Sequence, residues 1–213
     1  MKYLLLTIIQ VSLFFGASAQ DKKAEQILDA MSAKYKSLKT FNANFTYGVE
    51  GANAKLTNVF TGNVIVKGNK FKLKTAGQEI FNNGKELYTF VKETNEVNIS
   101  ELNTNDENDF SPTKIYTIYK KGYRYAFKEE KKIGSQTYEV VELSPTTTKA
   151  NVAKIQITVN KRDKSIKTWK VWDKSGKRTV FRIDKFIPNV AASDATFNFD
   201  KKKYPGVEVV DLR

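Results

Sequence analysis

Cysteine and histidine do not occur anywhere in the 213 residues of this sequence. Their absence removes the usual protein ligands of zinc, copper and haem, and it excludes nucleophilic catalysis by Ser-His or Cys-His systems. The neighbouring acids Asp106-Glu107 and Glu129-Glu130 stand in very polar stretches, which do not favour a buried carboxyl pair with shifted pKa values. We therefore expect a protein that is not an enzyme and that needs no metal, no cofactor and no disulfide.

Long hydrophobic runs are also missing. The apolar stretch at residues 3–15 is shorter than the roughly 20 residues that span a bilayer. Lys2 precedes it and Ala17-Ser18-Ala19 follows it, an arrangement typical of a cleaved secretory signal peptide. We therefore expect residues 1–19 to be a signal peptide and residues 20–213 to form one exported domain. With no cysteine at the cleavage site, the mature protein is not expected to carry a lipid of its own.

Acidic residues are fewer than basic ones, 23 against 36, which gives the chain a net charge of +13. Such an excess can indicate nucleic acid, an anionic membrane or an acidic protein as partner. Lysines alternate with apolar residues in Lys70-Phe71-Lys72-Leu73-Lys74, as on the solvated face of a strand. Nucleic acid is not expected for an exported protein. A solvated sheet face and electrostatic docking to an acidic protein or membrane both remain open.

What the chain does have is periodic apolar residues. Helical spacing over residues 24–38 predicts one amphipathic helix. Alternation at every second position predicts about ten to twelve strands with short connections, hence an antiparallel sheet. These strands are expected at residues 41–50, 55–66, 71–75, 78–81, 86–91, 97–102, 123–128, 138–143, 153–159, 166–172 and 179–187, with a tail at 194–199 and 207–212.

One segment in the middle of the chain breaks the strand pattern. Ser111-Pro112 has the form of a helix start, with serine at the N-cap and proline at the first helical position. Lys120-Lys121-Gly122 has the form of a helix end. The sequence therefore predicts a short helix that is apolar on more than one side, and that either plugs the sheet or covers its opening. The predicted fold class is mostly β with helices (α+β).

Four blocks of sequence resemble the outer-membrane lipoprotein carrier (LolA) family, and together they cover nearly the whole mature chain. The first helix runs into Phe41-Asn42-Ala43-Asn44-Phe45, and residues 62–73 resemble the family's Gly-x-hydrophobic-x-hydrophobic-Lys strand with its following Phe. Asn83-Gly84-Lys85-Glu86-Leu87-Tyr88 is similar to its Asp-Gly-x-x-Leu-Trp turn. The last block, residues 195–209, is similar to its closing Phe-x-Phe and Pro-x-Gly-Val pattern.

The resemblance implies an unclosed, strongly curved antiparallel β-barrel, covered by the N-terminal helix and a short central lid helix. It implies a carrier in the periplasm of a Gram-negative bacterium that binds the acyl chains of triacylated lipoproteins in an apolar cavity. Such a carrier takes its cargo from an inner-membrane lipoprotein exporter complex and delivers it to an outer-membrane receptor or to the outer membrane itself. We expect it to act as a monomer.

Two departures from the family pattern leave alternatives open. Many members have Arg-Pro where this chain has Gly68-Asn69-Lys70, and Tyr88 replaces a tryptophan. The resemblance ties that arginine to closure of the lid and to forward transfer. The alternatives are a non-transporting lipoprotein sensor or receptor domain of the same fold, and a paralogue that carries another lipid.

The candidate lipid-binding residues are apolar positions on the predicted strands and on the central segment. An ordinary filled core would show the same pattern. We expect the last three members of the set to form the lid and to collapse onto each other when the cavity is empty. The set comprises Phe45, Phe71, Leu73, Ile80, Leu87, Phe90, Ile115, Ile118 and Tyr119.

Overall fold

The computed structural model describes residues 21–102, 111–147 and 150–213. The predicted signal peptide and the acids Asp106-Glu107 lie outside the described residues. Within the described ranges, no helix is both long enough and apolar enough to cross a membrane.

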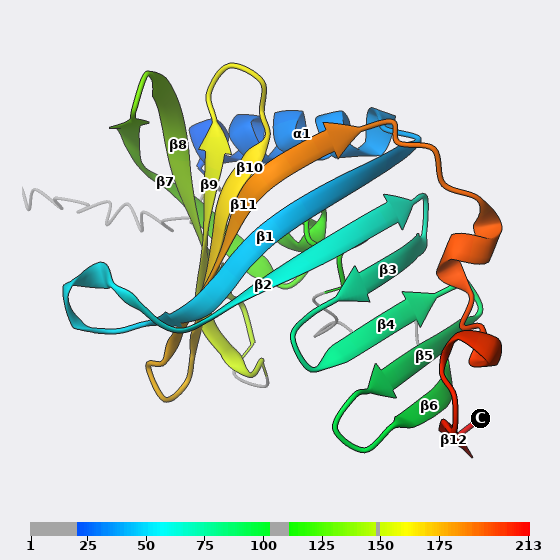
Figure 1. The fold of residues 1–213 in the computed structure, drawn as a ribbon. Coiled ribbons are helices and arrows are strands. Elements are labelled where there is room, and N and C mark those ends of the chain that lie inside the picture. The colour runs from blue at the N-terminus through cyan, green and yellow to red at the C-terminus, as the bar shows by residue number, and fades with distance from the viewer. Residues whose placement is uncertain (1–20, 103–110, 148–149) are drawn as a thin grey trace, which may run out of the picture.

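The described strands form one twelve-stranded sheet, in the order β12-β6-β5-β4-β3-β2-β1-β11-β10-β9-β8-β7. Because β12 and β7 end the series without pairing with each other, the sheet does not close. In Figure 1 the strands β7 to β10 stand upright while β3 to β6 run obliquely, which shows how strongly the sheet twists. The predicted fold class is confirmed. The strands are β1 (Thr40–Glu50), β2 (Leu56–Lys67), β3 (Lys70–Lys74), β4 (Gln78–Asn82), β5 (Glu86–Val91), β6 (Glu96–Glu101), β7 (Tyr123–Ile133), β8 (Gln136–Pro145), β9 (Val152–Asn160), β10 (Ile166–Asp173), β11 (Arg178–Pro188) and β12 (Glu208–Asp211).

The end of the chain corrects the prediction that every strand pair is antiparallel. β12 pairs with β6 in parallel, with Val209 opposite Val97. The chain leaves β11 and runs along the end of β3 to β6 before it reaches β6 from the same side (Figure 1). On this path Asp194–Phe197 and Lys201–Lys203 are 3-10 helices, so the first part of the predicted tail, residues 194–199, is not extended throughout.

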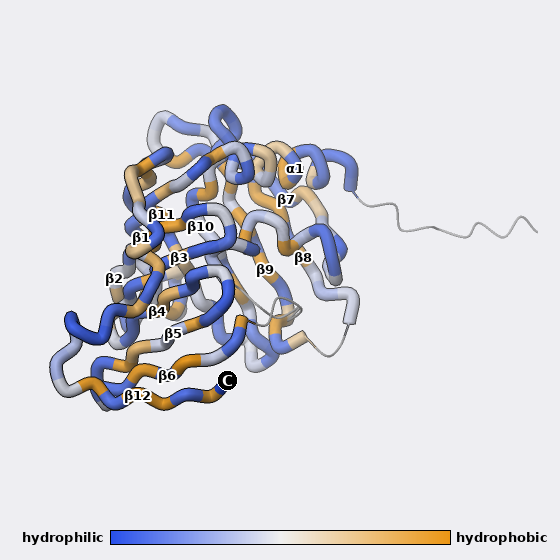
Figure 2. The backbone as a smooth tube through the Cα atoms, turned by 90° about the vertical axis from the view of Figure 1, so that its right-hand side faces the viewer, coloured by the Kyte–Doolittle hydropathy of each residue, from blue (hydrophilic) through white to orange (hydrophobic). Residues whose placement is uncertain are grey.

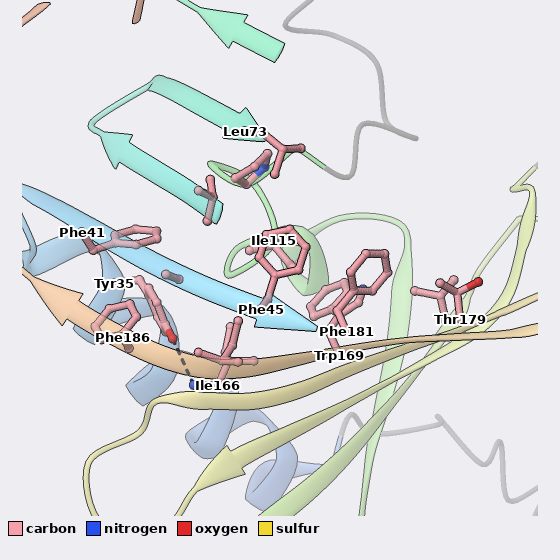
Figure 3. Close-up of a pocket in the computed structure, with 15 residues that line it drawn as sticks. Tyr35, Phe41, Phe45, Leu73, Ile115, Ile166, Trp169, Thr179, Phe181 and Phe186 are labelled. Carbon is pink, nitrogen blue, oxygen red and sulfur yellow. Dashed lines mark hydrogen bonds between the residues drawn. The ribbon is translucent and has the colours of Figure 1, made fainter. Parts of the chain in front are cut away.

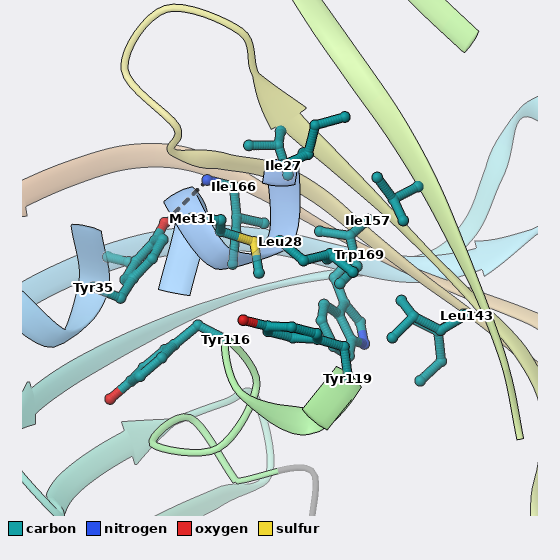
Figure 4. Close-up of a cluster of buried hydrophobic side chains, with 14 of the residues drawn as sticks. Ile27, Leu28, Met31, Tyr35, Tyr116, Tyr119, Leu143, Ile157, Ile166 and Trp169 are labelled. Carbon is teal, nitrogen blue, oxygen red and sulfur yellow. Dashed lines mark hydrogen bonds between the residues drawn. The ribbon is translucent and has the colours of Figure 1, made fainter. Parts of the chain in front are cut away.

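Helix α1 (Lys22–Ser37) is the amphipathic helix that the sequence predicts. The Asp21 carboxylate caps it, accepting hydrogen bonds from the N–H of Ala24 at 3.0 Å and from the N–H of Phe127 on β7 at 2.9 Å. The same side chain therefore starts the helix and ties it to the sheet. Figure 4 shows the helix over the inner side of the sheet, where its apolar stripe is buried: Ala24, Ile27, Leu28, Met31 and Tyr35.

The central segment, residues 111–121, is not the predicted α-helix. Residues 112–117 form turns, and only Ile118–Lys120 is helical, as a single 3-10 turn. We name residues 111–121 the covering segment. A helix as short as this segment is marginal by itself in water, so tertiary contacts decide the conformation of the segment. The Tyr116 ring stacks on Tyr35 at 5.3 Å between centroids, and Tyr119 is 3 % exposed.

Apolar side chains gather in two places. The main core lies between α1, the inner face of the sheet and the covering segment. Its counterpart at the other end of the sheet lies where the C-terminal segment packs on β4 to β6. In Figure 2 the apolar stretches of β9 lie at the end of the sheet that holds the main core, and those of β6 and β12 lie at the opposite end. We name the rings at the second end the C-terminal aromatic cluster: Phe81, Tyr88, Phe90, Phe199 and Tyr204.

Candidate functional site

A cavity of about 410 Å³ lies inside the main core, on the concave side of the sheet. Its volume falls in the range of roughly 300–1,000 Å³ that is usual for small-molecule sites. Figure 3 shows the lining side chains converging on one space between the strands and the segment that carries Ile115. We name this cavity the pocket. Its lining comes from α1, β1, β2, β3, β10, β11 and the covering segment: Tyr35, Phe41, Ala43, Phe45, Val64, Leu73, Pro112, Ile115, Ile166, Trp169, Val171, Thr179, Phe181, Ile183 and Phe186.

The alternation of β1 explains why the pocket forms on this face. Phe41, Ala43 and Phe45 point inward, whereas Asn42 and Asn44 point outward and accept hydrogen bonds from the Asn63 amide at 2.8 and 2.5 Å. Alanine between two phenylalanines leaves space where a larger side chain would fill the core. β1 thus contributes two large side chains to the pocket wall and, at Ala43, a small one that leaves space.

Gly62 on β2 lets the Phe45 ring lie flat against the sheet. A Cβ at this position would overlap ring atoms of Phe45 and would come within 2.9 Å of the Lys74 carbonyl oxygen. Any side chain at residue 62 would therefore displace Phe45 from the pocket wall.

The pocket offers almost no polar chemistry. No charged side chain occurs among its described lining residues. The Tyr35 hydroxyl accepts a hydrogen bond from the Ile166 N–H at 3.0 Å, and burial raises the pKa of Tyr35 to about 12, so this group stays neutral at physiological pH. A guest would be held by apolar contacts alone.

The covering segment is fastened to α1. The Tyr119 hydroxyl donates a hydrogen bond to the Asp29 carboxylate at 2.5 Å, and the Lys120 ammonium lies 3.3 Å from the same oxygen. The hydrogen bond from Tyr119, and then the charge of Lys120, lower the pKa of Asp29. Burial, followed by this bond, raises the pKa of Tyr119. The fastening lies at the end of the segment, while Pro112 and Ile115 face the pocket.

The structure divides the nine candidate residues into three groups. Phe45, Leu73 and Ile115 line the pocket. Five others lie in the main core or pack against it without lining the pocket: Phe71, Ile80, Leu87, Ile118 and Tyr119. Phe90 is buried in the C-terminal aromatic cluster, with its ring 4.5 Å from that of Tyr204.

The expectation for Phe90 is therefore corrected. Leu87 packs against the main core, and Phe90 lies three residues further along the same strand. Side chains separated by an odd number of positions point to opposite faces of a strand. Phe90 and Leu87 cannot both face the pocket.

The sequence predicted the strands β10 and β11, but none of the candidate residues came from them, although they supply almost half of the lining. Their apolar alternation was visible in Trp169 and Val171 and in Phe181 and Ile183. Phe186 lies at an even position, whereas Phe181 and Ile183 lie at odd positions, yet all three face the pocket. The reason is a bulge that places one extra residue in β11: Asn44 pairs with Lys185, but Phe45 pairs with Ile183. Only the register reveals that inward position.

A family model described as "Outer membrane lipoprotein carrier protein LolA" matches residues 36–200 of the chain. No curated protein matches the chain. An uncharacterized conserved protein from Thermus thermophilus is similar in structure, with a TM-score of 0.61, 12 % identity, and coverage of 89 % of this chain and 99 % of that one. At such identity the similarity shows the fold alone.

Two further solved structures are similar. The lipoprotein LppX of Mycobacterium tuberculosis has a TM-score of 0.50 and 12 % identity, with 81 % of this chain and 98 % of that one covered. The LolA superfamily protein NE2245 of Nitrosomonas europaea has a TM-score of 0.43 and 14 % identity, with 83 % and 97 % covered.

Proposed function

Since the chain belongs to the outer membrane lipoprotein carrier protein LolA family, we propose that it is a carrier that shelters acyl chains of lipoproteins in the pocket. The observation that supports this most is the pocket itself: about 410 Å³ between the concave face and the covering segment, with no charged side chain among its described lining residues. Members of this family are carriers or binding proteins, and an apolar lining suits binding.

The proposed route begins in the periplasm. Residues 1–19, as a signal peptide, would direct the chain there, and the cargo would be triacylated lipoproteins. An inner-membrane exporter complex would load the pocket, and an outer-membrane receptor or the outer membrane itself would receive the chains.

The physical task of such a carrier is to match the bilayer. Each methylene group buried is worth about 0.8 kcal/mol, so acyl chains leave a membrane only for comparable apolar surroundings. The rings and aliphatic side chains around the pocket offer these. Ile115 on the covering segment would contact the guest directly, whereas Ile118 and Tyr119 would hold the segment in place from the core side.

A transfer assay tests this proposal. Mature protein is incubated with inner membranes that hold a triacylated lipoprotein, and the lipoprotein released into solution and delivered to outer membranes is measured. Ile115→Asp places a charge in the pocket and is expected to reduce both steps at least tenfold, on the order of what burying a charge costs. Ile187→Asp is the matched control, because Ile187 is an isoleucine on β11 that is 39 % exposed and does not line the pocket.

The outcomes separate the alternatives. Release without delivery would contradict a carrier and favour a sensor or receptor domain of the same fold. Transfer of another lipid in place of lipoprotein would identify a paralogue with different cargo. Equal activity of Ile115→Asp and Ile187→Asp would exclude the pocket as the binding site.

A further inference from the structure

A row of aromatic rings leads out of the pocket along the β1–β2 hairpin. The pocket residue Phe181 stacks on Tyr47 at 5.8 Å between centroids, and Tyr47 lies 5.5 Å from Phe60, its partner in the β1–β2 register. Phe60 is 44 % exposed. The apolar surface of the pocket thus continues without interruption to the outside of the molecule.

Val59, which precedes Phe60 in the chain, is exposed as well and lies in a bulge. Asn58 and Val59 together stand opposite the single residue Gly48, and Asn58 has a φ of +48°. A Cβ on Gly48 would come within 2.9 Å of the Thr57 carbonyl oxygen, so glycine is required where the strands approach. Bulges of this kind re-aim side chains, and Val59 is 52 % exposed.

Among the described strands, none covers this region from the other side. β3 pairs with β2 only from Asn63 to Lys67, which leaves Leu56 to Gly62 paired with β1 alone among the described strands. We name Val59 and Phe60 the lip. Exposed valine and phenylalanine side by side, at the end of a row of rings that begins in the apolar pocket, form a surface that favours contact with another apolar phase.

Positive charge accompanies the lip. Lys74 borders the same surface hollow as Val59 and Phe60, as does Asp184. The Lys74 side chain is 55 % exposed while its ammonium lies 3.5 Å from the Glu79 carboxylate, and exposed Lys55 immediately precedes β2. The chain as a whole carries +13. Apolar side chains flanked by lysines are the combination that binds the interface of an anionic bilayer.

We propose that the lip is a membrane-contact site, where Val59 and Phe60 enter the head-group region of an anionic phospholipid bilayer. The row Phe60–Tyr47–Phe181 then gives an acyl chain a continuous apolar path between the bilayer and the pocket. This inference rests on the proposed function, because the path has a purpose only if the pocket receives acyl chains.

Flotation with vesicles of phosphatidylglycerol and phosphatidylcholine tests the contact. The double variant Val59→Asp/Phe60→Asp is expected to lose about tenfold in vesicle binding, since two apolar groups are replaced by anions. Binding of the wild type is expected to weaken as salt is raised and to fall on pure phosphatidylcholine. Ile187→Asp, an exposed apolar position away from the lip, is expected to float like the wild type. Phe60→Ala, with no added charge, is expected to show a smaller loss.

A second readout keeps this inference separate from the proposed function. Binding of a fluorescent fatty acid from free solution is expected to be the same in the double variant and in the wild type. If neither protein binds the fatty acid, the proposed function fails, whatever the flotation shows. If the double variant floats with vesicles as well as the wild type does, the lip is not a membrane-contact site. Flotation is repeated with native membranes that contain proteins. If the double variant loses binding only to these membranes and not to the lipid vesicles, the lip contacts a membrane protein and is not a membrane-contact site.

Discussion

The pocket and the C-terminal aromatic cluster are built from the same kinds of residue, yet one is hollow and the other is filled. In the cluster, the Tyr204 ring lies 4.5 Å from Phe90 and 4.6 Å from Phe199. Rings that line the pocket also touch, as Phe41 and Phe186 do at 5.4 Å, but Ala43 stands between larger neighbours and a cavity of about 410 Å³ remains. Aromatic content alone therefore does not make a cavity; small residues and a partly fastened cover do.

The two regions also differ in how they are closed. The Tyr204 hydroxyl donates a hydrogen bond to the buried Glu79 carboxylate at 3.0 Å, so that the C-terminal segment is anchored inside its own cluster. The covering segment is anchored beside the pocket, through Tyr119 and the half-exposed Asp29. The anchor of the covering segment thus lies beside the pocket, whereas its residues Pro112 and Ile115 face into the pocket.

The largest expected difference is in stability. Phe90→Ala is expected to lower the free energy of unfolding by about 3–4 kcal/mol, because it opens a void in a filled cluster. Phe181 is only partly buried and already borders a cavity, so Phe181→Ala removes less packing, and its expected cost is about 2 kcal/mol. Urea denaturation of both variants measures the two costs. Equal costs would mean that the pocket is as well packed as the cluster.

The second expectation is that filling the hollow removes the difference between the regions. Ala43→Leu places a larger side chain in the pocket, and the affinity for a fluorescent fatty acid is expected to fall about tenfold, or about 1.4 kcal/mol. The free energy of unfolding is expected to change by less than about 1 kcal/mol. Asn42→Leu, the neighbouring outward position, is the control. Unchanged affinity in Ala43→Leu would place the guest elsewhere.

The third expectation concerns the anchor of the covering segment. Tyr119→Phe removes the hydrogen bond to Asp29, at an expected cost of about 1 kcal/mol, since the carboxylate is half exposed. Amides of residues 111–121 are then expected to exchange hydrogen faster than in the wild type. Asp29→Asn, which keeps an acceptor, is expected to have a smaller effect. If exchange in Tyr119→Phe is unchanged, the segment is held by packing alone.

The smallest expected effect is a pH dependence of the cluster. Burial alone would raise the pKa of Glu79, but the hydrogen bond from Tyr204 and the charges of Lys72 and Lys74 bring it below the ordinary value of 4.5. As the pH falls, the Glu79 carboxyl therefore binds a proton in the unfolded protein before it does so in the folded protein. This contribution to stability is present above a pH of about 4.5 and is lost as the pH falls through the folded pKa. Unfolding measured on both sides of that pH should show a weaker dependence in Tyr204→Phe, and an equal dependence would contradict the assignment to Glu79.

The sequence allowed the sheet and α1 to be predicted because periodicity acts locally. Alternation in β1 places Phe45 correctly, and the helical stripe of α1 ends in the buried Tyr35. The covering segment could not be predicted, since Tyr116 and Tyr119 take their positions from α1, far away in the chain. Phe186 could not be predicted either, because its inward orientation depends on the β1–β11 register.

The parallel β12 has a similar explanation. Its short alternation identifies a strand, but its direction relative to β6 depends on the path that the chain takes after β11. By contrast, the error at Phe90 was avoidable. The parity of β5 was present in the sequence and excluded Leu87 and Phe90 from sharing a face.

The most direct test of the account is native mass spectrometry of the protein purified from its own host, compared with Ile115→Asp prepared in the same way. We predict a population of wild-type protein that is heavier by the mass of a triacylated lipoprotein, and the loss of that population in Ile115→Asp but not in Ile187→Asp. Wild-type protein that is reproducibly empty, even after incubation with lipoprotein-loaded membranes, would contradict the claim that the pocket carries acyl chains.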